Sequence, residues 1–439
     1  MQCVTTSPMR NSGITPYNLI LPPALFILKQ IGKVQEKVGL FFSLRRSVFT
    51  ELEAATVTIS SGRFRMWVHA ASVGEFEQAR PVISALKKSH PDIAVFVSFL
   101  SDSGYNARKN YPDADAVFYL PADTPENAEK TASLVKADIF MLMRYDFWPN
   151  HLLAAKRHGA TMILAAAVLR PGSAYFNPLL KGFYRTVFNL FDRIFTVSEN
   201  DARAFRERFG CIQAETAGEP RIDQVILRSR HTEHVAHLKT HFTNRSVLVA
   251  GSVWEKDEEL ILEAMRSLQN PPSLILVPHK VDKENIERIE KRLQTENLGS
   301  ARVSCLEESF DAQKQVLIID QTGYLLELYS LASIAYVGGG FGVNVHNTLE
   351  PSVYAIPVIF GPRYHNSPEA ETLLQTGGAS TAQTPEELSR ILDRLINREG
   401  AAEQQGNAAG EFIRNGAGAT ARISGFAERV IQQAIPQPN

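Results

Sequence analysis

Short apolar runs alternate with longer, polar, helix-favouring segments along most of this chain. Between residues 64 and 223 these runs are 65–69, 94–99, 116–120, 139–143, 161–166 and 193–197. The pattern returns further along the chain, in the runs 246–250, 273–277, 316–319, 334–337 and 358–360. Strands that are this short and apolar are typical of a parallel sheet covered by helices on both faces. The sequence therefore predicts an α/β protein with two open sheets in tandem.

A length of 439 residues also fits two domains, because single hydrophobic cores rarely grow beyond about 250–300 residues. We expect a separate N-terminal segment over residues 1–50, a first domain over 51–225 and a linker over 226–245. The second domain should then span 246–439, including the C-terminal helices. Two such sheets leave a cleft between them, and ligands are expected at the carboxyl ends of the strands.

Composition and missing fingerprints exclude several classes of protein. A net charge of -1 argues against a general nucleic-acid binder, and the three cysteines lack the spacing of a disulfide framework or zinc site. The phosphate-loop pattern G-x-x-x-x-G-K-[ST] and the hydrolase pattern G-x-S-x-G do not occur. The run Gly338–Gly342 lacks the third glycine of G-x-G-x-x-G, which weakens the case for a nucleotide-dependent oxidoreductase.

The segment HAASVGE, residues 69–75, joins a predicted strand to a predicted helix. Small residues such as Ser72 and Gly74 let a ligand approach the backbone, and unpaired N–H groups at a helix start favour an anion. Glu75 stands at this turn. Its carboxylate either complements the helix dipole or acts as a base toward a bound substrate, and the local sequence leaves both interpretations open.

A second turn of the same kind follows the predicted strand 334–337. Glycines at 338–340 end the strand, and a helix is expected to begin near His346-Asn347, where its N–H groups could hold a phosphate. Glu350, one turn further, could accept the hydroxyl groups of a ribose. The alternative is that Glu350 caps its own helix.

The N-terminal region combines apolar and basic residues. Residues 19–28 form a run of ten apolar residues, too short for a spanning helix, which needs about 20. A convincing signal peptide is not evident. The basic residues that follow favour a helix lying on an anionic membrane surface, although docking on the protein's own core is the alternative. They are Lys29, Lys33, Lys37, Arg45 and Arg46.

Several blocks in this order and at these separations resemble one known family. They are HAASVGE with FEQARP, Tyr145–Asn150, Ala250–Ser252, GGG…HNTLEP and Pro357–Pro362. Over residues 15–425 the chain resembles the Kdo transferases, which attach 3-deoxy-D-manno-octulosonic acid (Kdo) to lipid A during lipopolysaccharide assembly. The resemblance implies the GT-B architecture, two Rossmann-like domains facing a central cleft, with CMP-Kdo as donor. It also implies an inverting reaction at the cytoplasmic face of the bacterial inner membrane, held there by the N-terminal segment.

The resemblance assigns roles to residues of this chain. Glu75 becomes the general base, and Asp146 is an acceptor-side residue together with Ser72 and Gly74. The donor side falls on Arg221, Ser252, Pro278, Gly339, Gly340, Asn347 and Glu350. Positive side chains and helix N–H groups can stabilise a departing cytidine monophosphate, so neither a metal nor another cofactor is expected.

The chain departs from the family pattern at several places. Residues 144–146 read Arg-Tyr-Asp where most members have Glu-x-Glu, and residues 218–221 read Gly-Glu-Pro-Arg in place of Gly-Asn-x-Lys. Residues 253–258 and 278–280 differ from the family's Thr-His-Pro-Gly-Glu and Pro-Arg-His. These departures concern donor-phosphate contacts at single positions and not the class of the protein. Two alternatives stand beside the Kdo transferase interpretation. They are a GT-B enzyme with a UDP-sugar donor and a two-lobed, non-catalytic nucleotide-sugar-binding protein.

Overall fold

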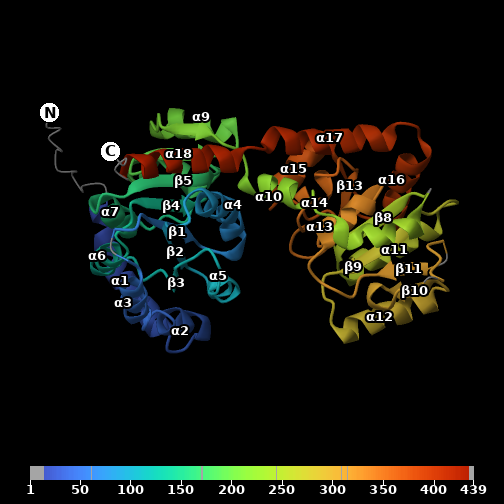
Figure 1. Ribbon diagram of the computed structural model, residues 1–439, viewed down its shortest axis with the longest axis horizontal. Helices are drawn as coiled ribbons and strands as arrows, with labels where there is room; N and C mark the ends of the chain where they lie inside the picture. The colour runs from blue at the N-terminus through green and yellow to red at the C-terminus, as the bar shows by residue number, and fades with distance from the viewer. Residues whose placement is uncertain are drawn as a thin grey trace. The chain divides into compact units, whose positions relative to one another are not determined.

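The computed structural model describes residues 14–60, 62–169, 172–243, 245–307, 309–313 and 315–434. The chain forms two compact units (Figure 1). Unit 1 comprises Met1–Asp223 together with Gly418–Asn439, and unit 2 comprises Gln224–Ala417. The α/β fold class predicted from the sequence is confirmed, with one parallel sheet in each unit.

Unit 1 holds a parallel sheet in the order β3-β2-β1-β4-β5-β6-β7. Its strands are β1 (Arg65–Ala70), β2 (Ala94–Phe99), β3 (Ala116–Tyr119), β4 (Ile139–Met143), β5 (Thr161–Ala167), β6 (Arg193–Thr196) and β7 (Ala214–Thr216). Its helices are α1 (Thr15–Ile31), α2 (Glu36–Ser43), α3 (Val48–Thr58), α4 (Val73–Ser89), α5 (Asp102–Arg108), α6 (Pro125–Val135), α7 (Pro149–Arg157), η2 (Ala174–Phe176), α8 (Pro178–Phe188), α9 (Glu199–Phe209), the start of α10 (Pro220–Arg228), and α18 (Ala419–Ala434).

Unit 2 repeats this arrangement in the order β10-β11-β9-β8-β12-β13-β14. Its strands are β8 (Val247–Val253), β9 (Ser273–Pro278), β10 (Gly299–Arg302), β11 (Gln315–Ile318), β12 (Ile334–Val337), β13 (Val358–Phe360) and β14 (Ala379–Thr381). Its helices are η3 (Glu233–Phe242), α11 (Glu255–Arg266), α12 (Lys283–Thr295), η4 (Val303–Cys305), α13 (Leu325–Leu328), η5 (Tyr329–Leu331), α14 (Leu349–Ser352), α15 (Pro368–Gln375), α16 (Pro385–Asn397) and α17 (Ala401–Gly416). The sequence missed β7, β10 and β14, because strands of three or four residues at or near a sheet edge carry little apolar pattern.

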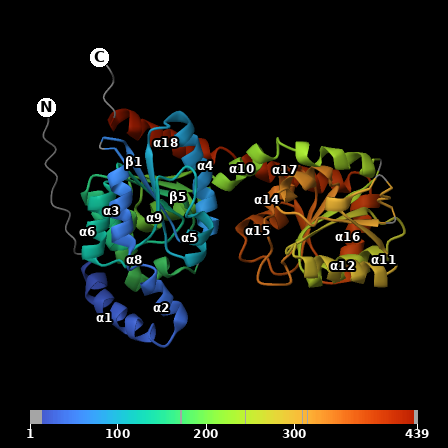
Figure 2. The ribbon, with the colours of Figure 1, turned by 60° about the horizontal axis from the view of Figure 1, so that its bottom comes forward.

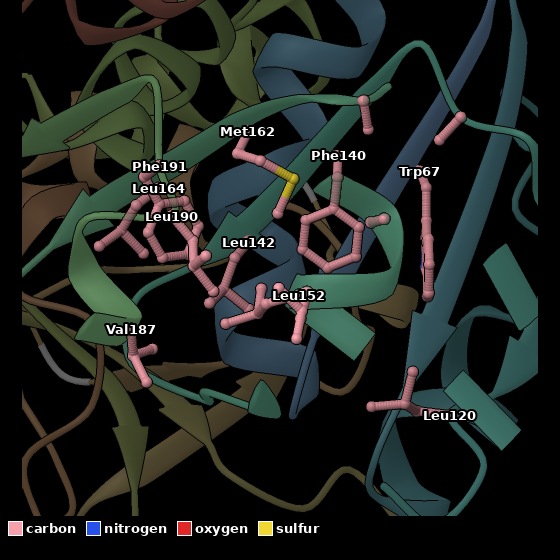
Figure 3. Packing of buried hydrophobic residues seen from close by; sticks show 14 of the residues in the cluster. Trp67, Leu120, Phe140, Leu142, Leu152, Met162, Leu164, Val187, Leu190 and Phe191 are labelled. Carbon is pink, nitrogen blue, oxygen red and sulfur yellow. The ribbon is translucent and has the colours of Figure 1, made fainter. Parts of the chain in front are cut away.

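Alternation along the strands divides the core of unit 1 into two layers. Trp67 and Phe140 pack on one face of the sheet with Leu152 of α7 and Val187 of α8 (Figure 3). On the other face, strand residues such as Val68 pack against α4 and α18. The strands are therefore buried on both sides, which explains why they read as continuous apolar runs.

The last helix corrects the expected domain boundaries. We expected the C-terminal helices to belong to the second domain, but Ile423 and Ala427 of α18 pack into the core of unit 1. Asp223 fixes this return, because its carboxylate accepts hydrogen bonds from Gly418 N and Thr420 N, each 2.6 Å long. An isolated sequence pattern cannot reveal such a crossing, since its partners lie far apart in the chain.

The expected linker over 226–245 is likewise part of a unit. Its described residues fold into the end of α10 and η3, and Val235, Leu238 and Phe242 of η3 are buried in the core of unit 2. The many charged and histidine residues between these three positions hide their spacing. The segment contributes to a hydrophobic core and does not merely connect two domains.

The N-terminal segment is also built into unit 1. Ile14 and Val48 lie in its core. Tyr17 Oη donates to Asp123 Oδ2 at 2.9 Å, and Asn150 Nδ2 donates to Asn18 Oδ1 at 2.8 Å. The prediction of a separate segment over 1–50 is therefore wrong. Helices α1 and α2 lie side by side at one end of the unit (Figure 2), and no described helix is long and apolar enough to cross a bilayer.

Arg45 anchors α2 to the sheet. Its guanidinium donates to Leu100 O at 2.6 Å, to Leu120 O at 2.7 Å and to Phe41 O at 2.9 Å. It also stacks 3.6 Å above the Phe41 ring. Arg45 thus belongs to the fold, whereas the neighbouring Arg46 is exposed.

Arg45→Ala should therefore lower the free energy of unfolding by about 1.5–3 kcal/mol, because carbonyl groups lose a charged donor. Arg46→Ala is the matched control and should change it by less than about 0.5 kcal/mol. Urea unfolding followed by circular dichroism would measure both variants. Equal stability of the two variants would contradict the anchoring role.

Candidate active site

Glu75 lies in the first turn of α4, close to the carboxyl end of strand β1. Ser72 is the N-cap of α4, and its Oγ accepts a hydrogen bond from Glu75 N at 3.4 Å. The carboxylate of Glu75 turns back and accepts from Ala71 N at 2.6 Å. Glu75 is only 7% exposed, and this burial raises its pKa, opposed by the Ala71 N–H. Glu75 is therefore part of the helix start, as one of the two interpretations held. The same contacts hold its carboxylate in place, and burial makes that carboxylate a stronger base than usual.

His69 and Asp146 meet beside Glu75. His69 is buried at the end of β1, and its Nε2 lies 3.0 Å from Asp146 Oδ2 while its Nδ1 contacts Ser98 Oγ at 2.8 Å. Trp148 Nε1 donates to the same Asp146 oxygen at 2.8 Å. The charges of Asp146 and His69 both act on the pKa of Glu75. The structure therefore brings the predicted Glu75 and Asp146 together and adds His69, which the sequence did not single out.

The surface over the first turn of α4 is open. A Cβ built on Gly74 would meet only Ser72 Oγ, at 4.0 Å. The glycine is therefore not required by the packing of the unit. This observation is compatible with the close approach of a ligand that the sequence predicts for Ser72 and Gly74.

The predicted donor residue Arg221 lies in unit 1, paired with Glu219. Arg221 Nε and Nη2 contact the two carboxylate oxygens of Glu219 at 3.1 and 3.2 Å. The same carboxylate accepts from Arg144 Nη2 at 3.1 Å. Favourable charges of Arg221 and Arg144 outweigh burial and hold the pKa of Glu219 below its usual value. Contact of Arg221 with a donor stays a prediction.

In unit 2, three of the predicted donor residues line one cavity. It has a volume of about 290 Å³. Its lining consists of Arg228, Ser252, Gly323, Leu325, Leu326, Tyr329, Val337, His346, Asn347 and Glu350. Burial raises the pKa of Glu350, whereas the nearby Arg228 and a hydrogen bond from Asn347 lower it. Arg228, from α10, carries a positive charge to this cavity, and no sequence motif marked it.

Backbone strain directs Ser252 to the cavity. Its φ is 53°, in the left-handed region, and the register of β8 against β9 shifts between Gly251 and Val253. Irregularities of this kind often re-aim a side chain at a functional site. Gly251 itself is required by packing, since a Cβ there would collide with the hydroxyl of Tyr329.

The glycine run after β12 owes its composition to packing. Gly339 N donates to the buried Asp257 Oδ2 at 3.0 Å, and its φ is 91°. A Cβ on Gly340 would lie 2.6 Å from the backbone of Gly361. The predicted role of Gly339 and Gly340 in donor binding stays a prediction. These positions require glycine because of the backbone conformation and the close packing inside the unit.

The helix predicted near His346 begins later and is short. It is α14, which runs over Leu349–Ser352, and Asn347 Oδ1 accepts from Leu349 N at 3.1 Å. Asn347 therefore already occupies one N–H group that was expected to hold a phosphate. The expected start near His346-Asn347 is wrong because this segment forms the loop that places Asn347 and Glu350 on the cavity.

Pro278 is buried at the end of β9, and the exposed His279 follows it directly. The His279 ring stacks on Trp254 at 4.3 Å and on His346 at 4.6 Å between centroids. Trp254 Nε1 donates to His346 Nε2 at 3.1 Å, so Trp254 and His346 lie edge to edge beneath His279. Burial lowers the pKa of His346 and of His279, which favours the uncharged form of each ring.

Comparisons with known proteins show which family this chain resembles. The model of the 3-deoxy-D-manno-octulosonic-acid transferase (kdotransferase) family matches residues 33–224. The 3-deoxy-D-manno-octulosonic acid transferase of Chlamydophila psittaci is 29% identical over 337 residues, covering 75% of this chain and 77% of that protein. The Aquifex aeolicus enzyme of the same name is 29% identical over 320 residues, covering 72% and 80%.

A solved structure supports the fold assignment. The UDP-GlcNAc 2-epimerase from Neisseria meningitidis has a TM-score of 0.56 at 15% identity, covering 84% of this chain and 99% of that one. At this identity the likeness shows the fold alone, a two-domain α/β architecture of the GT-B kind. The family model over residues 33–224 and the relatives that span most of the chain show that this chain is similar in sequence to the Kdo transferases.

Proposed function

We propose that this protein transfers Kdo from CMP-Kdo to a hydroxyl group of a lipid A precursor, with inversion at the sugar. The observation that carries the proposal is the position of the Glu75 carboxylate. It is buried near the carboxyl end of β1 and flanked by His69 and Asp146. The chain around it is similar to the Kdo transferases. Direct displacement requires a base for the acceptor hydroxyl and no covalent intermediate.

On the acceptor side, Glu75 takes the proton of the attacking hydroxyl. Burial makes it a stronger base than an ordinary carboxylate, and the Ala71 N–H holds its orientation. Asp146, fixed by His69 and Trp148, positions the acceptor. Because Glu75 acts in its deprotonated form, activity should be present above its pKa and be lost as the pH falls through it.

On the donor side, the cavity of unit 2 has the groups that a nucleoside monophosphate requires. The Glu350 carboxylate can accept ribose hydroxyls, and Ser252 and Asn347 can complete the hydrogen bonding. Arg228 contributes positive charge for the phosphate of the leaving group. We infer CMP-Kdo as the donor from the family. A UDP-sugar donor is the alternative that ligand titration would distinguish.

A membrane surface is the proposed location, specifically the cytoplasmic face of the bacterial inner membrane. Several large apolar residues of α1 are exposed, with Leu19 at 73%, Phe26 at 64% and Ile27 at 57%. Lys29, Lys33, Lys37 and Arg46, which follow in the sequence, are exposed as well. Such a face can enter the headgroup region of an anionic membrane without crossing it.

Glu75→Gln tests the base. The amide oxygen of Gln can still accept from Ala71 N, so the helix cap remains while the proton acceptor is lost. Transfer of Kdo from labelled CMP-Kdo to a lipid A precursor should fall by roughly 10²–10⁴, with unchanged thermal stability. Glu77→Gln, on the same helix, is the control and should stay active. Near-normal turnover of Glu75→Gln would leave the residue only as a cap.

Glu350→Ala should weaken CMP binding roughly 10- to 150-fold, the equivalent of a lost charged hydrogen bond of about 1.5–3 kcal/mol. Isothermal titration with CMP would measure it, with Glu290→Ala in the same unit as control. UDP binding more tightly than CMP to the unchanged protein would favour the alternative donor. An unchanged CMP affinity of Glu350→Ala would remove Glu350 from the donor site.

The membrane proposal requires point substitutions, because deletion of the N-terminal segment would also remove core contacts. A Leu19→Ser, Phe26→Ser, Ile27→Ser triple variant should lose sedimentation with vesicles that contain anionic phospholipid, while CMP binding is kept. Raised salt should weaken vesicle binding of the unchanged protein. Ile212→Ser, at an exposed apolar residue elsewhere on unit 1, is the control. Sedimentation of the triple variant at the level of the unchanged protein would contradict the proposal.

A further inference from the structure

A buried ionic network lies beside Glu75 in unit 1. Its centre is Glu219, which is only 3% exposed. Gln78 Nε2 donates to both oxygens of this carboxylate, at 2.9 and 2.7 Å, and Arg144 and Arg221 donate to it as well. Gln78 lies three residues after Glu75 on α4, so both side chains leave the helix on neighbouring positions of one face. The network therefore begins about one helical turn from Glu75 on α4.

Arg144 is held in this network from two sides. Its Nε donates to Gln78 Oε1 at 2.8 Å, and its Nη2 donates to Glu219 Oε2 at 3.1 Å. Its backbone has a φ of 62°, a left-handed conformation that is unfavourable for a residue other than glycine. Arg144 N donates to Ala165 O of β5 at 2.9 Å, so the backbone is fixed as well as the side chain.

The two partners of this ion pair are departures from the family pattern. By the resemblance drawn from the sequence motifs, position 144 corresponds to an acid and is Arg here, and position 219 corresponds to Asn and is Glu here. In the sequence these changes are 75 residues apart and look independent. The structure joins them in one ion pair with side chains that are 12% and 3% exposed. Either change alone would remove one ionic contact from a buried network, which is destabilising.

We propose that Gln78, Arg144 and Glu219 act together as a positioning unit that places a permanent positive charge beside the base and takes the place of the family's first acid. The inference rests on the proposed role of Glu75. The groups that face Glu75 are His69 from β1, Asp146 and Arg144 from the segment after β4, and Tyr175 from η2. Asp146 opposes deprotonation of Glu75, whereas Arg144 favours it at every pH.

The first test is the pH dependence of Kdo transfer. Arg144→Met removes the charge, so the acid limb of the pH profile should move to higher pH and activity should fall several-fold more at low pH than at high pH. Arg144→Lys keeps a charge and should retain the limb of the unchanged protein more closely. Arg302→Met removes an arginine paired with Glu290 in unit 2 and is the control. An unmoved limb in Arg144→Met would overturn the electrostatic role.

The second test asks whether the two positions act as one. Arg144→Glu alone places a carboxylate against the buried Glu219, and Glu219→Asn alone removes the partner of Arg144. Each should lower the melting temperature and activity. The double variant, with the family's residues at both positions, should recover part of both losses. A soluble double variant beside an insoluble single one supports the same conclusion. Simple additivity of the two changes would overturn the proposal.

The two proposals can fail separately. An active Glu75→Gln variant would remove the base itself, and with it the proposed mechanism. An inactive Glu75→Gln variant combined with an unmoved limb in Arg144→Met would reject only the role of the network. The melting temperatures of the single and double variants do not depend on either mechanism, so they report the coupling of Arg144 and Glu219 directly.

Discussion

The parallel pairing of β1 with β4 is the constraint on which the acceptor site depends. It aligns His69 with Leu142, so the segments that leave these two strands emerge at the same edge of the sheet. One segment continues into the first turn of α4 and the other into the Trp-Pro-Asn block. The contact of His69 with Asp146, across 77 residues of sequence, follows from that alignment. Moving the register of β4 would separate the base from its neighbours.

Acidic side chains are buried near the carboxyl ends of these strands, and this burial explains the hydrogen-bond donors and positive charges around them. Glu75 and Asp146 repel each other, and a buried carboxylate is costly without a hydrogen-bond donor or a positive charge. Ala71 N, His69 and Trp148 supply donors to these two residues, and Arg144 and Arg221 neutralise Glu219 behind them. These charges are therefore linked, and one side chain cannot change sign without affecting its neighbours.

The shape of the proposed donor cavity in unit 2 depends more on backbone packing than on charge. Asp257 is fully buried and binds Trp254 N, Gly339 N and Tyr336 Oη, so it fixes both the start of α11 and the glycine loop. Glycines are needed there because the loop lies against the backbone of Ser252 and Gly361. That close packing leaves the specific contacts to the side chains of Ser252, Asn347 and Glu350, which line the cavity.

The sequence by itself determined the two sheets, most of their strands and the resemblance to the Kdo transferases, because apolar period and contiguous motifs are local properties. It also singled out Glu75 and Asp146, which the structure places near each other, and three of the residues that line the cavity of unit 2. Only the tertiary structure decided the return of α18 to unit 1, the anchoring of Arg45 and the pairing of Arg144 with Glu219. Each of these depends on partners that are distant in sequence, and whether a charged side chain is a surface group, an anchor or half of a buried pair is set by what the folded chain places against it.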